Sequence, residues 1–133
     1  KIITPHMGEF HKIFPNINKN LNSLDKVINA SKLIKSNILL KGSSTIVSSY
    51  NKKIVINTHT SSELAVIGSG DVLSGLIVSL VGVKKMSPFL AGCAATWLHG
   101  DIAKNYGRGL IAEDIVKGIP RALKRLKDGK FIK

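Results

Sequence analysis

The feature that most constrains the fold of this chain is the glycine-rich segment Gly68-Ser69-Gly70-Asp71, which leads directly into an apolar run at residues 72–80. Glycines expose backbone N–H groups, and the apolar run predicts a helix, so these N–H groups lie at a helix N-terminus. Such a terminus carries unpaired donors and partial positive charge, and it therefore favours an anion. We expect Gly68, Ser69 and Gly70 to form an anion hole.

Asp71 is the unusual member of this segment, because a carboxylate repels a bound phosphate. It fits a base that removes a proton from a hydroxyl while a phosphoryl group arrives. The alternative interpretation is an ordinary loop in which Asp71 caps the helix. From the segment alone both interpretations stay open.

The remaining pattern predicts a layered α/β fold. An amphipathic helix at residues 21–34 precedes the wholly apolar strand Ile38-Leu39-Leu40, and β-branched residues at 45–47 and 53–56 predict a hairpin. Strand, helix, strand, hairpin and then a helical second half is an α/β order. The other expected elements are a strand end at 2–3, a short helix at 9–14, a polar loop at 57–67 and helices at 72–83, 88–106 and 113–127.

Only about four strands are predicted, and a strand as apolar as residues 38–40 is typical of a sheet that is covered on both faces. We therefore expect residues 1–133 to be a single partial domain, part of a larger one. Ser87 and Pro88 are expected to start the second of the three C-terminal helices. Pro120 is expected to kink or split the last one.

Composition restricts the class of protein. No apolar run is long enough for a membrane span, and the lone Cys93 in an apolar helical pattern predicts a core residue in a reducing, cytoplasmic compartment. The net charge is +12, from 20 Lys and Arg against 8 Asp and Glu. Because the basic residues are scattered and not interleaved with aromatic ones, nucleic-acid binding is disfavoured. Two explanations of the positive charge remain: attraction of a phosphate-rich small substrate, or a composition that is generally rich in lysine.

Two further segments are candidates for ligand binding. His6 follows a strand end in Thr4-Pro5-His6, where it contacts a ligand or simply ends a rigid turn. Lys41, Gly42, Ser43, Ser44 and Thr45 follow the buried strand. Their charge and hydroxyls suit a nucleotide phosphate or ribose, and a hairpin turn is the alternative.

The remaining histidines favour structural roles. In Leu98-His99-Gly100-Asp101 we expect a packed helix end, with Gly100 allowing close approach, and Trp97 in the core. His11 and His59 have no convincing partner in the sequence. One cysteine and four scattered histidines match no metal-ligand spacing, so no protein-held metal is expected.

Several motifs occur in a fixed order along nearly the whole chain, and together they resemble the ADP-dependent NAD(P)H-hydrate dehydratases. This YjeF C-terminal family belongs to the ribokinase-like superfamily. The resemblance implies the C-terminal portion of a ribokinase-like layered α/β/α fold, with a partial sheet. The motifs are TPHxGEF from Thr4, LLKGSSTIV from Leu39, GSGDVLSG from Gly68, WLHG from Trp97 and GLIAEDIVKGIPRAL from Gly109.

The resemblance also implies a reaction. ADP, or ATP in some members, donates a phosphoryl group with Mg²⁺ to the ring hydroxyl of hydrated NADH or NADPH, and phosphate is then eliminated. Carried onto this chain, His6 contacts the hydrated cofactor, Lys41 to Thr45 line the adenine-nucleotide site, and Gly70 touches the nucleotide phosphate. Asp71 contacts the substrate and activates its hydroxyl.

The chain departs from the family pattern in three places. The family domain is much longer, and its front half has no counterpart here. The loop before the anion hole carries Thr60, Ser61, Glu63 and Ile67 where the family has Gly, Asn, Gly and Gly. The segment after Gly100 is short. We therefore expect a homo-oligomer or a separate N-terminal half as partner. An inactive remnant, a nucleotide-binding half of a split enzyme and a small-molecule kinase of the same superfamily remain alternatives.

Overall fold

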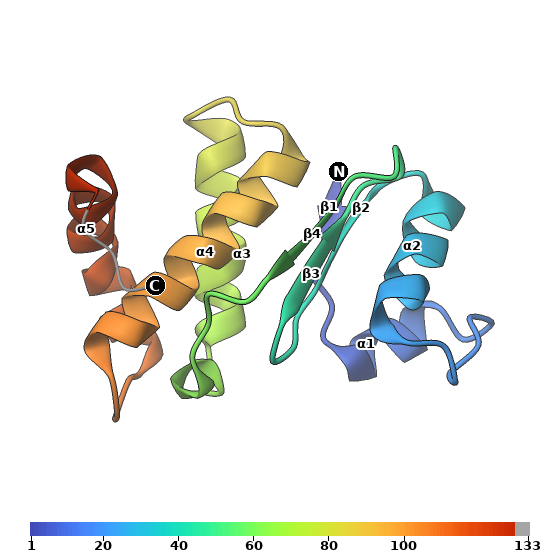
Figure 1. Ribbon diagram of the computed structural model, residues 1–133, viewed down its shortest axis with the longest axis horizontal. Helices are drawn as coiled ribbons and strands as arrows, with labels where there is room; N and C mark the ends of the chain where they lie inside the picture. Colours follow the sequence, from blue (N-terminus) through green and yellow to red (C-terminus); the bar gives the residue numbers. More distant parts are fainter. Residues whose placement is uncertain (130–133) are drawn as a thin grey trace.

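In the computed structural model, which describes residues 1–129, a four-stranded sheet is flanked by helices on both faces (Figure 1). Residues 130–133, the end of the expected domain 1–133, lie outside the described residues. The elements are β1 (Ile2–Ile3), α1 (Met7–Ile13), α2 (Ser23–Ile34), β2 (Asn37–Leu40), β3 (Thr45–Ser48), β4 (Ile54–Asn57), the 3₁₀ helix η1 (Ser62–Leu64), α3 (Ser69–Gly82), α4 (Pro88–Tyr106) and α5 (Ala112–Asp128).

The sheet has the order β1-β2-β3-β4, in which β1 and β2 are parallel and the other pairs are antiparallel. In this register Leu39 faces Val47, and Leu40 faces Ile46. Because side chains alternate between the two faces of a strand, the apolar strand β2 contributes to two separate cores. The predicted strand and hairpin are confirmed.

The two cores lie on opposite faces of the sheet. Ile38 and Leu40 pack with Phe10 of α1 and Val27 of α2. Leu39 packs on the other face with α3 and α4, where the buried residues include Val47, Leu73, Leu76, Ile77, Ala91 and Ala95. A third cluster joins α4 to α5, and α5 lies at the end of the molecule away from α1 and α2 (Figure 1). This is the expected α/β/α layering.

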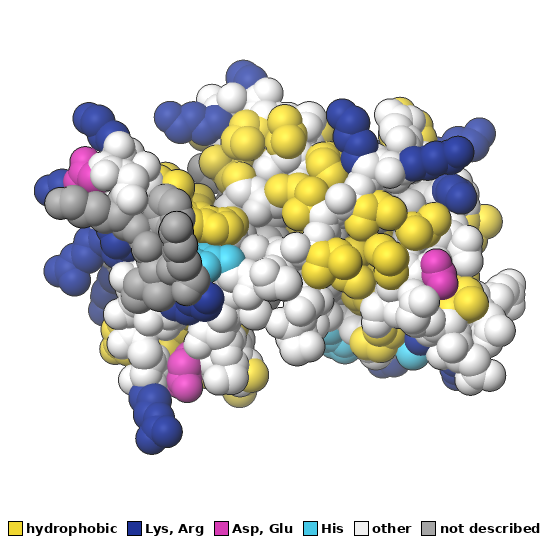
Figure 2. All heavy atoms as spheres, in the orientation of Figure 1, with side chains coloured by type: hydrophobic (Ala, Val, Ile, Leu, Met, Phe, Trp, Pro, Cys, Tyr) yellow, Lys and Arg dark blue, Asp and Glu magenta, His cyan; other side chains and the backbone are white. Residues whose placement is uncertain are grey.

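Both edges of the sheet are open within the described residues. Strand β1 is two residues long and lies at one edge, and β4 lies at the other. Ile54, Val55 and Ile56 of β4 are exposed. Figure 2 shows hydrophobic side chains gathered on the face in view, over the region of the sheet where β4 lies in Figure 1.

Helix boundaries follow local capping, with three corrections. Helix α1 begins at Met7 rather than at residue 9, because His6 is its N-cap. Helix α3 begins at Ser69 rather than at residue 72, so the glycine-rich segment itself forms the first helical turn. The predicted split of α5 at Pro120 is wrong, because Ile115 and Ala122 are both buried and hold one continuous helix against its neighbours.

Ser87 caps α4 through the Leu90 N–H at 3.3 Å, and Pro88 lies in its first turn, as expected. Within residues 1–129, no helix combines the length and the apolar character needed to cross a bilayer.

Candidate functional site

A cavity of about 710 Å³ lies between one end of the sheet and the first turn of α3. Because β1 and β2 are parallel, their carboxyl ends lie at the same end of the sheet. The segments that follow them leave the sheet there, and His6 and Lys41 form a parallel bridge. The residues that line the cavity are His6, Lys41, Gly42, Ser43, Thr45, Thr60, Ser61, Ser62, Leu64, Ala65, Val66, Ser69, Gly70, Leu73, Thr96 and His99.

His6 is positioned by the start of α1. Its Nδ1 accepts from the Glu9 N–H at 3.2 Å, and Glu9 Oε2 accepts from the His6 N–H at 2.8 Å. In this reciprocal capping box, the other Glu9 oxygen, Oε1, lies 3.6 Å from His6 Nε2, so the carboxylate lies beside the ring. The bond from the His6 backbone is the main reason that the pKa of Glu9 lies below its usual value. The spacing in the TPHxGE motif is thus explained by a helix cap.

Lys41 brings positive charge to the start of α3. A Cβ built on Gly70 would lie 3.3 Å from Lys41 Nζ, so the ammonium sits against this first turn. Lys41 Nζ also lies 3.7 Å from Glu9 Oε2. The Lys41 N–H donates to the Pro5 carbonyl at 2.9 Å, which ties the strand end to the His6 segment. An ammonium beside a helix N-terminus is a strong anion site.

The first turn of α3 leaves one backbone donor for a ligand. Gly68 has φ 84°, a left-handed conformation that suits glycine. The Ser69 N–H donates to the Val66 carbonyl at 3.2 Å, and the Asp71 N–H donates to the Gly68 carbonyl at 3.1 Å. Among residues 1–129 the structure pairs no acceptor with the Gly70 N–H. Of the donors in this turn, the Gly70 N–H thus fits the expected anion hole best, and the anion hole itself stays a prediction.

The structure brings most of the expected site residues together. His6, Lys41, Gly42, Ser43, Thr45, Ser69 and Gly70 line one cavity, although they come from three separate segments. Ser44, Gly68 and Asp71 are outside its lining. Asp71 is exposed on the first turn of α3, directly after Gly70.

The sequence did not single out His99 as a residue of this cavity. It is buried, and its Nε2 lies 3.0 Å from the Ser69 carbonyl and 3.1 Å from Ser69 Oγ. A carbonyl only accepts, so Nε2 carries a hydrogen and donates. Burial lowers the pKa of His99, and the bond to the Ser69 backbone opposes that change. No local signal reveals this role, because the contact joins α4 to α3.

Acidification is expected to destabilise the folded protein partly through His99. Because the folded pKa is lowered, the unfolded chain binds the proton first, and the stabilisation is full above the usual histidine pKa of about 6.5. It is lost as the pH falls through the folded pKa. The free energy of unfolding, measured with urea, should fall less between neutral and mildly acidic pH in His99→Gln than in the parent. Equal losses would contradict this role.

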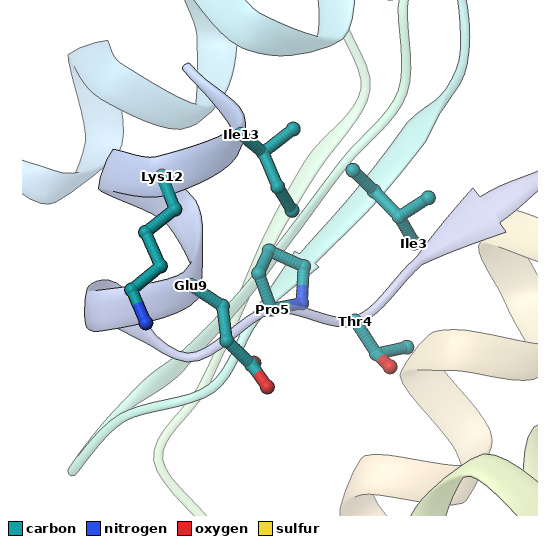
Figure 3. A pocket seen from close by; sticks show the side chains of 6 residues that line it. All are labelled: Ile3, Thr4, Pro5, Glu9, Lys12 and Ile13. Atoms are coloured by element: carbon teal, nitrogen blue, oxygen red, sulfur yellow. The ribbon is translucent and has the colours of Figure 1, made fainter. Parts of the chain in front are cut away.

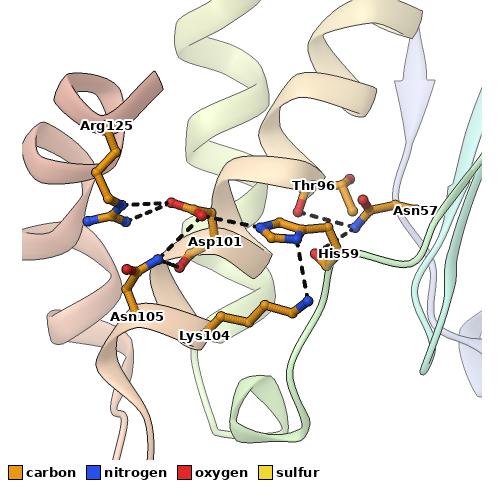
Figure 4. A network of polar contacts seen from close by, with 7 residues as sticks. All are labelled: Asn57, His59, Thr96, Asp101, Lys104, Asn105 and Arg125. Carbon is orange, nitrogen blue, oxygen red and sulfur yellow. Dashed lines mark hydrogen bonds and ion pairs between the residues drawn. The ribbon is translucent and has the colours of Figure 1, made fainter. Parts of the chain in front are cut away.

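A second polar cluster lies between α4, α5 and the loop after β4 (Figure 4). Asp101 is fully buried and accepts from Arg125 Nη2 at 2.7 Å and from Arg125 Nε at 3.2 Å. His59 Nε2 lies 3.2 Å from Asp101 Oδ1, and the His59 ring stacks on Trp97. The expectation that His59 has no convincing partner is therefore wrong. Its partner lies 42 residues away, beyond any local pattern.

The expected role of Gly100 is confirmed, because a Cβ there would lie 1.8 Å from the His59 carbonyl oxygen. Within residues 1–129, no group of three or more His, Cys, Asp and Glu side chains is placed to hold a metal ion.

The fold and the site define a layered α/β protein in which a lysine lies beside the glycine-rich N-terminus of a helix. Solved structures share this fold. The ADP/ATP-dependent NAD(P)H-hydrate dehydratase from Bacillus subtilis, co-crystallised with ATP/Mg²⁺ and soaked with CoA, matches with a TM-score of 0.86 and 27% identity, over 93% of this chain and 48% of that one. A ribokinase-like superfamily protein from Enterococcus faecalis, 21% identical with a TM-score of 0.80, matches 93% of this chain and 44% of its own.

The NAD(P)H-hydrate dehydratase family model matches residues 1–121, and the chain belongs to this family. The ADP-dependent (S)-NAD(P)H-hydrate dehydratase of Neisseria meningitidis is 33% identical over 123 residues, which are 86% of this chain and 41% of the relative. The bifunctional NAD(P)H-hydrate repair enzyme of Thermosynechococcus vestitus is 38% identical over 103 residues, which are 77% of this chain and 20% of the relative. The chain thus spans less than half the length of these relatives.

Proposed function

We propose that this chain supplies the nucleotide-binding half of an ADP-dependent NAD(P)H-hydrate dehydratase. One observation supports the proposal most directly: the Lys41 ammonium lies beside Gly70, whose N–H is unpaired, on one wall of the cavity. A terminal phosphate fits this pair, because both groups favour negative charge and neither has a full complement of acceptors. Ser43 and Thr45 place hydroxyls beside the same wall for the rest of the nucleotide.

In this proposal Asp71 is the base. Its carboxylate takes the proton from the ring hydroxyl of hydrated NADH or NADPH while the hydroxyl oxygen bonds to the transferred phosphorus. The bond between that phosphorus and the remaining nucleotide oxygen breaks. The C–O bond to the new phosphate then breaks, phosphate leaves with the electron pair, and loss of a proton from the neighbouring ring carbon restores the dihydronicotinamide double bond. His6, which lines the same cavity, contacts the hydrated cofactor.

Mg²⁺ belongs to the proposal as a companion of the nucleotide. Mg²⁺ is usually held by substrate phosphates, waters and one or two carboxylates, and it neutralises charge that develops on the phosphates. Two exposed carboxylates beside the cavity lining fit that arrangement: Asp71 follows Gly70 directly, and Glu9 Oε2 lies 3.7 Å from Lys41 Nζ.

The other half of the domain is proposed to lie along β1, as a separate N-terminal polypeptide or through a second copy of the chain. A cavity of about 330 Å³ opens beside this edge, lined by Ile3, Thr4, Pro5, Glu9, Lys12 and Ile13 (Figure 3). Ile3, Pro5 and Ile13 present an apolar wall there, which suits a packed strand or helix. The proposed compartment is the reducing cytoplasm, in which Cys93 remains a thiol whose pKa is raised by burial.

The test of the proposal is a thermal melt with and without ADP and Mg²⁺. A ligand at about 100 times its Kd stabilises the folded state by about 2.7 kcal/mol, which raises the Tm by several degrees. We expect a cooperative transition that shifts upward with ADP. A cooperative transition whose Tm does not change with ADP would contradict the proposed nucleotide site.

Lys41→Ala is expected to remove most of this shift, because the ammonium beside the Gly70 N–H is lost. The matched control is Lys53→Ala, which removes an equal charge from an exposed position. If Lys41→Ala binds ADP as well as the parent does by calorimetry, the nucleotide lies elsewhere.

A further inference from the structure

The loop between β4 and α3 carries three hydroxyls that line the cavity, those of Thr60, Ser61 and Ser62. Its own hydrogen bonds are local. The Thr60 N–H donates to the Thr58 carbonyl at 3.0 Å, the Leu64 N–H donates to the Ser61 carbonyl at 3.2 Å, and Ser61 Oγ accepts from the Glu63 N–H at 3.2 Å. Such local bonds shape the loop but do not fix its position against the helices. Contacts with residues distant in the sequence must hold the loop in that position.

His59 directly precedes these hydroxyls, and its ring is bonded on both nitrogens (Figure 4). Lys104 Nζ lies 3.4 Å from Nδ1, and Asp101 Oδ1 lies 3.2 Å from Nε2. An ammonium only donates, so Nδ1 accepts and Nε2 donates to the carboxylate. The ring face stacks on Trp97 with centroids 4.7 Å apart. These contacts select one tautomer and one orientation of the imidazole.

Asp101 joins the loop to two helices. It is 0% exposed, and Arg125 of α5 supplies the two short bonds that compensate its charge. Asn105 Nδ2 adds a contact at 3.3 Å from the same helix as Asp101. A buried carboxylate is stable only when it is paired and hydrogen-bonded, so the arrangement tolerates little movement of His59.

The backbone of His59 is held as well as its ring. Asn57 Nδ2 donates to the His59 carbonyl at 3.2 Å. The same carbonyl lies against Gly100, where no side chain would fit. One residue before Thr60, therefore, both the main chain and the side chain are fixed on α4.

We propose that His59 and Asp101 are a positioning pair, which holds the loop at residues 60–66 in the conformation in which Thr60, Ser61 and Ser62 line the cavity. The pair touches no ligand and acts through the loop. The identity of the ligand rests on the proposed function, whereas the holding of the loop does not.

The test compares His59→Leu, which removes both ring bonds, with His59→Gln, which keeps an N–H donor for Asp101. Amide hydrogen exchange at residues 60–66 and ADP affinity are measured in the whole chain. In His59→Leu we expect exchange in the loop to rise about tenfold relative to β2 and β3, and ADP affinity to fall about tenfold, the effect of one hydrogen bond to a charged group. His59→Gln should restore most of both.

The control is His11→Leu on α1, the same change at a histidine outside this cluster, which should leave loop exchange as in the parent. Unchanged loop protection in His59→Leu would overturn the proposal, and so would a loosened loop that binds ADP as tightly as before. If the parent itself fails to bind ADP, the proposed function fails, and exchange at residues 60–66 still decides whether the pair holds the loop. Should His59→Leu fail to fold, Lys104→Met removes one of the two ring bonds and provides the same comparison.

Discussion

Asp71→Asn is expected to lower kcat/KM for the dehydration of hydrated NADH by about 10²- to 10⁴-fold, the usual contribution of a positioned base. Asparagine has nearly the same shape as aspartate and cannot accept the proton. ADP affinity should change little, because the proposed phosphate donors are the Gly70 backbone and the Lys41 ammonium, and both remain.

The measurement is steady-state formation of NADH, with the rest of the domain present, beside an ADP titration of the same variant. Asp128→Asn, at the exposed end of α5, is the matched control for the loss of one carboxylate. An Asp71→Asn protein that turns over like the parent would remove Asp71 from the chemistry. Loss of turnover together with loss of ADP binding would assign it to binding instead.

Gly100→Ala is expected to cause the largest loss of stability among the Gly→Ala substitutions of the described residues, about 3 kcal/mol or more. The new Cβ would lie 1.8 Å from the His59 carbonyl oxygen and 2.7 Å from its carbon. These are backbone atoms of a residue whose ring is bonded to Asp101, so neither partner can move without breaking that contact. Urea unfolding measures the difference.

Gly75→Ala is the matched control, because it lies inside α3 and a Cβ there meets nothing within 4 Å. Alanine is a better helix former than glycine, so this variant should be neutral or more stable by up to about 1 kcal/mol. If the two variants unfold at the same urea concentration, the result contradicts the close packing of Gly100 against the His59 backbone.

Much of the fold follows from patterns that span only a few residues. The wholly apolar run Ile38-Leu39-Leu40 predicts a strand between two cores, and β-branched residues predict the hairpin that follows it. Ser87 and Pro88 predict the start of α4 through capping, which depends on one turn of backbone. The glycine-rich turn and the lysine after the buried strand were also visible as anion-binding candidates, since each is chemically complete within a short segment.

The sequence by itself thus determined the order of the elements, the two-sided sheet and the separate candidate segments for the site. Only the tertiary structure decided which distant side chains meet. His59 reaches Asp101 across 42 residues, His99 reaches Ser69 across 30, and Arg125 reaches Asp101 across 24. It also kept α5 whole through Pro120, because packing at Ile115 and Ala122 outweighs a local break. The physical reason is one of range: capping and side-chain alternation act within a few residues, whereas burial and the pairing of buried charges depend on where the whole chain brings its segments together.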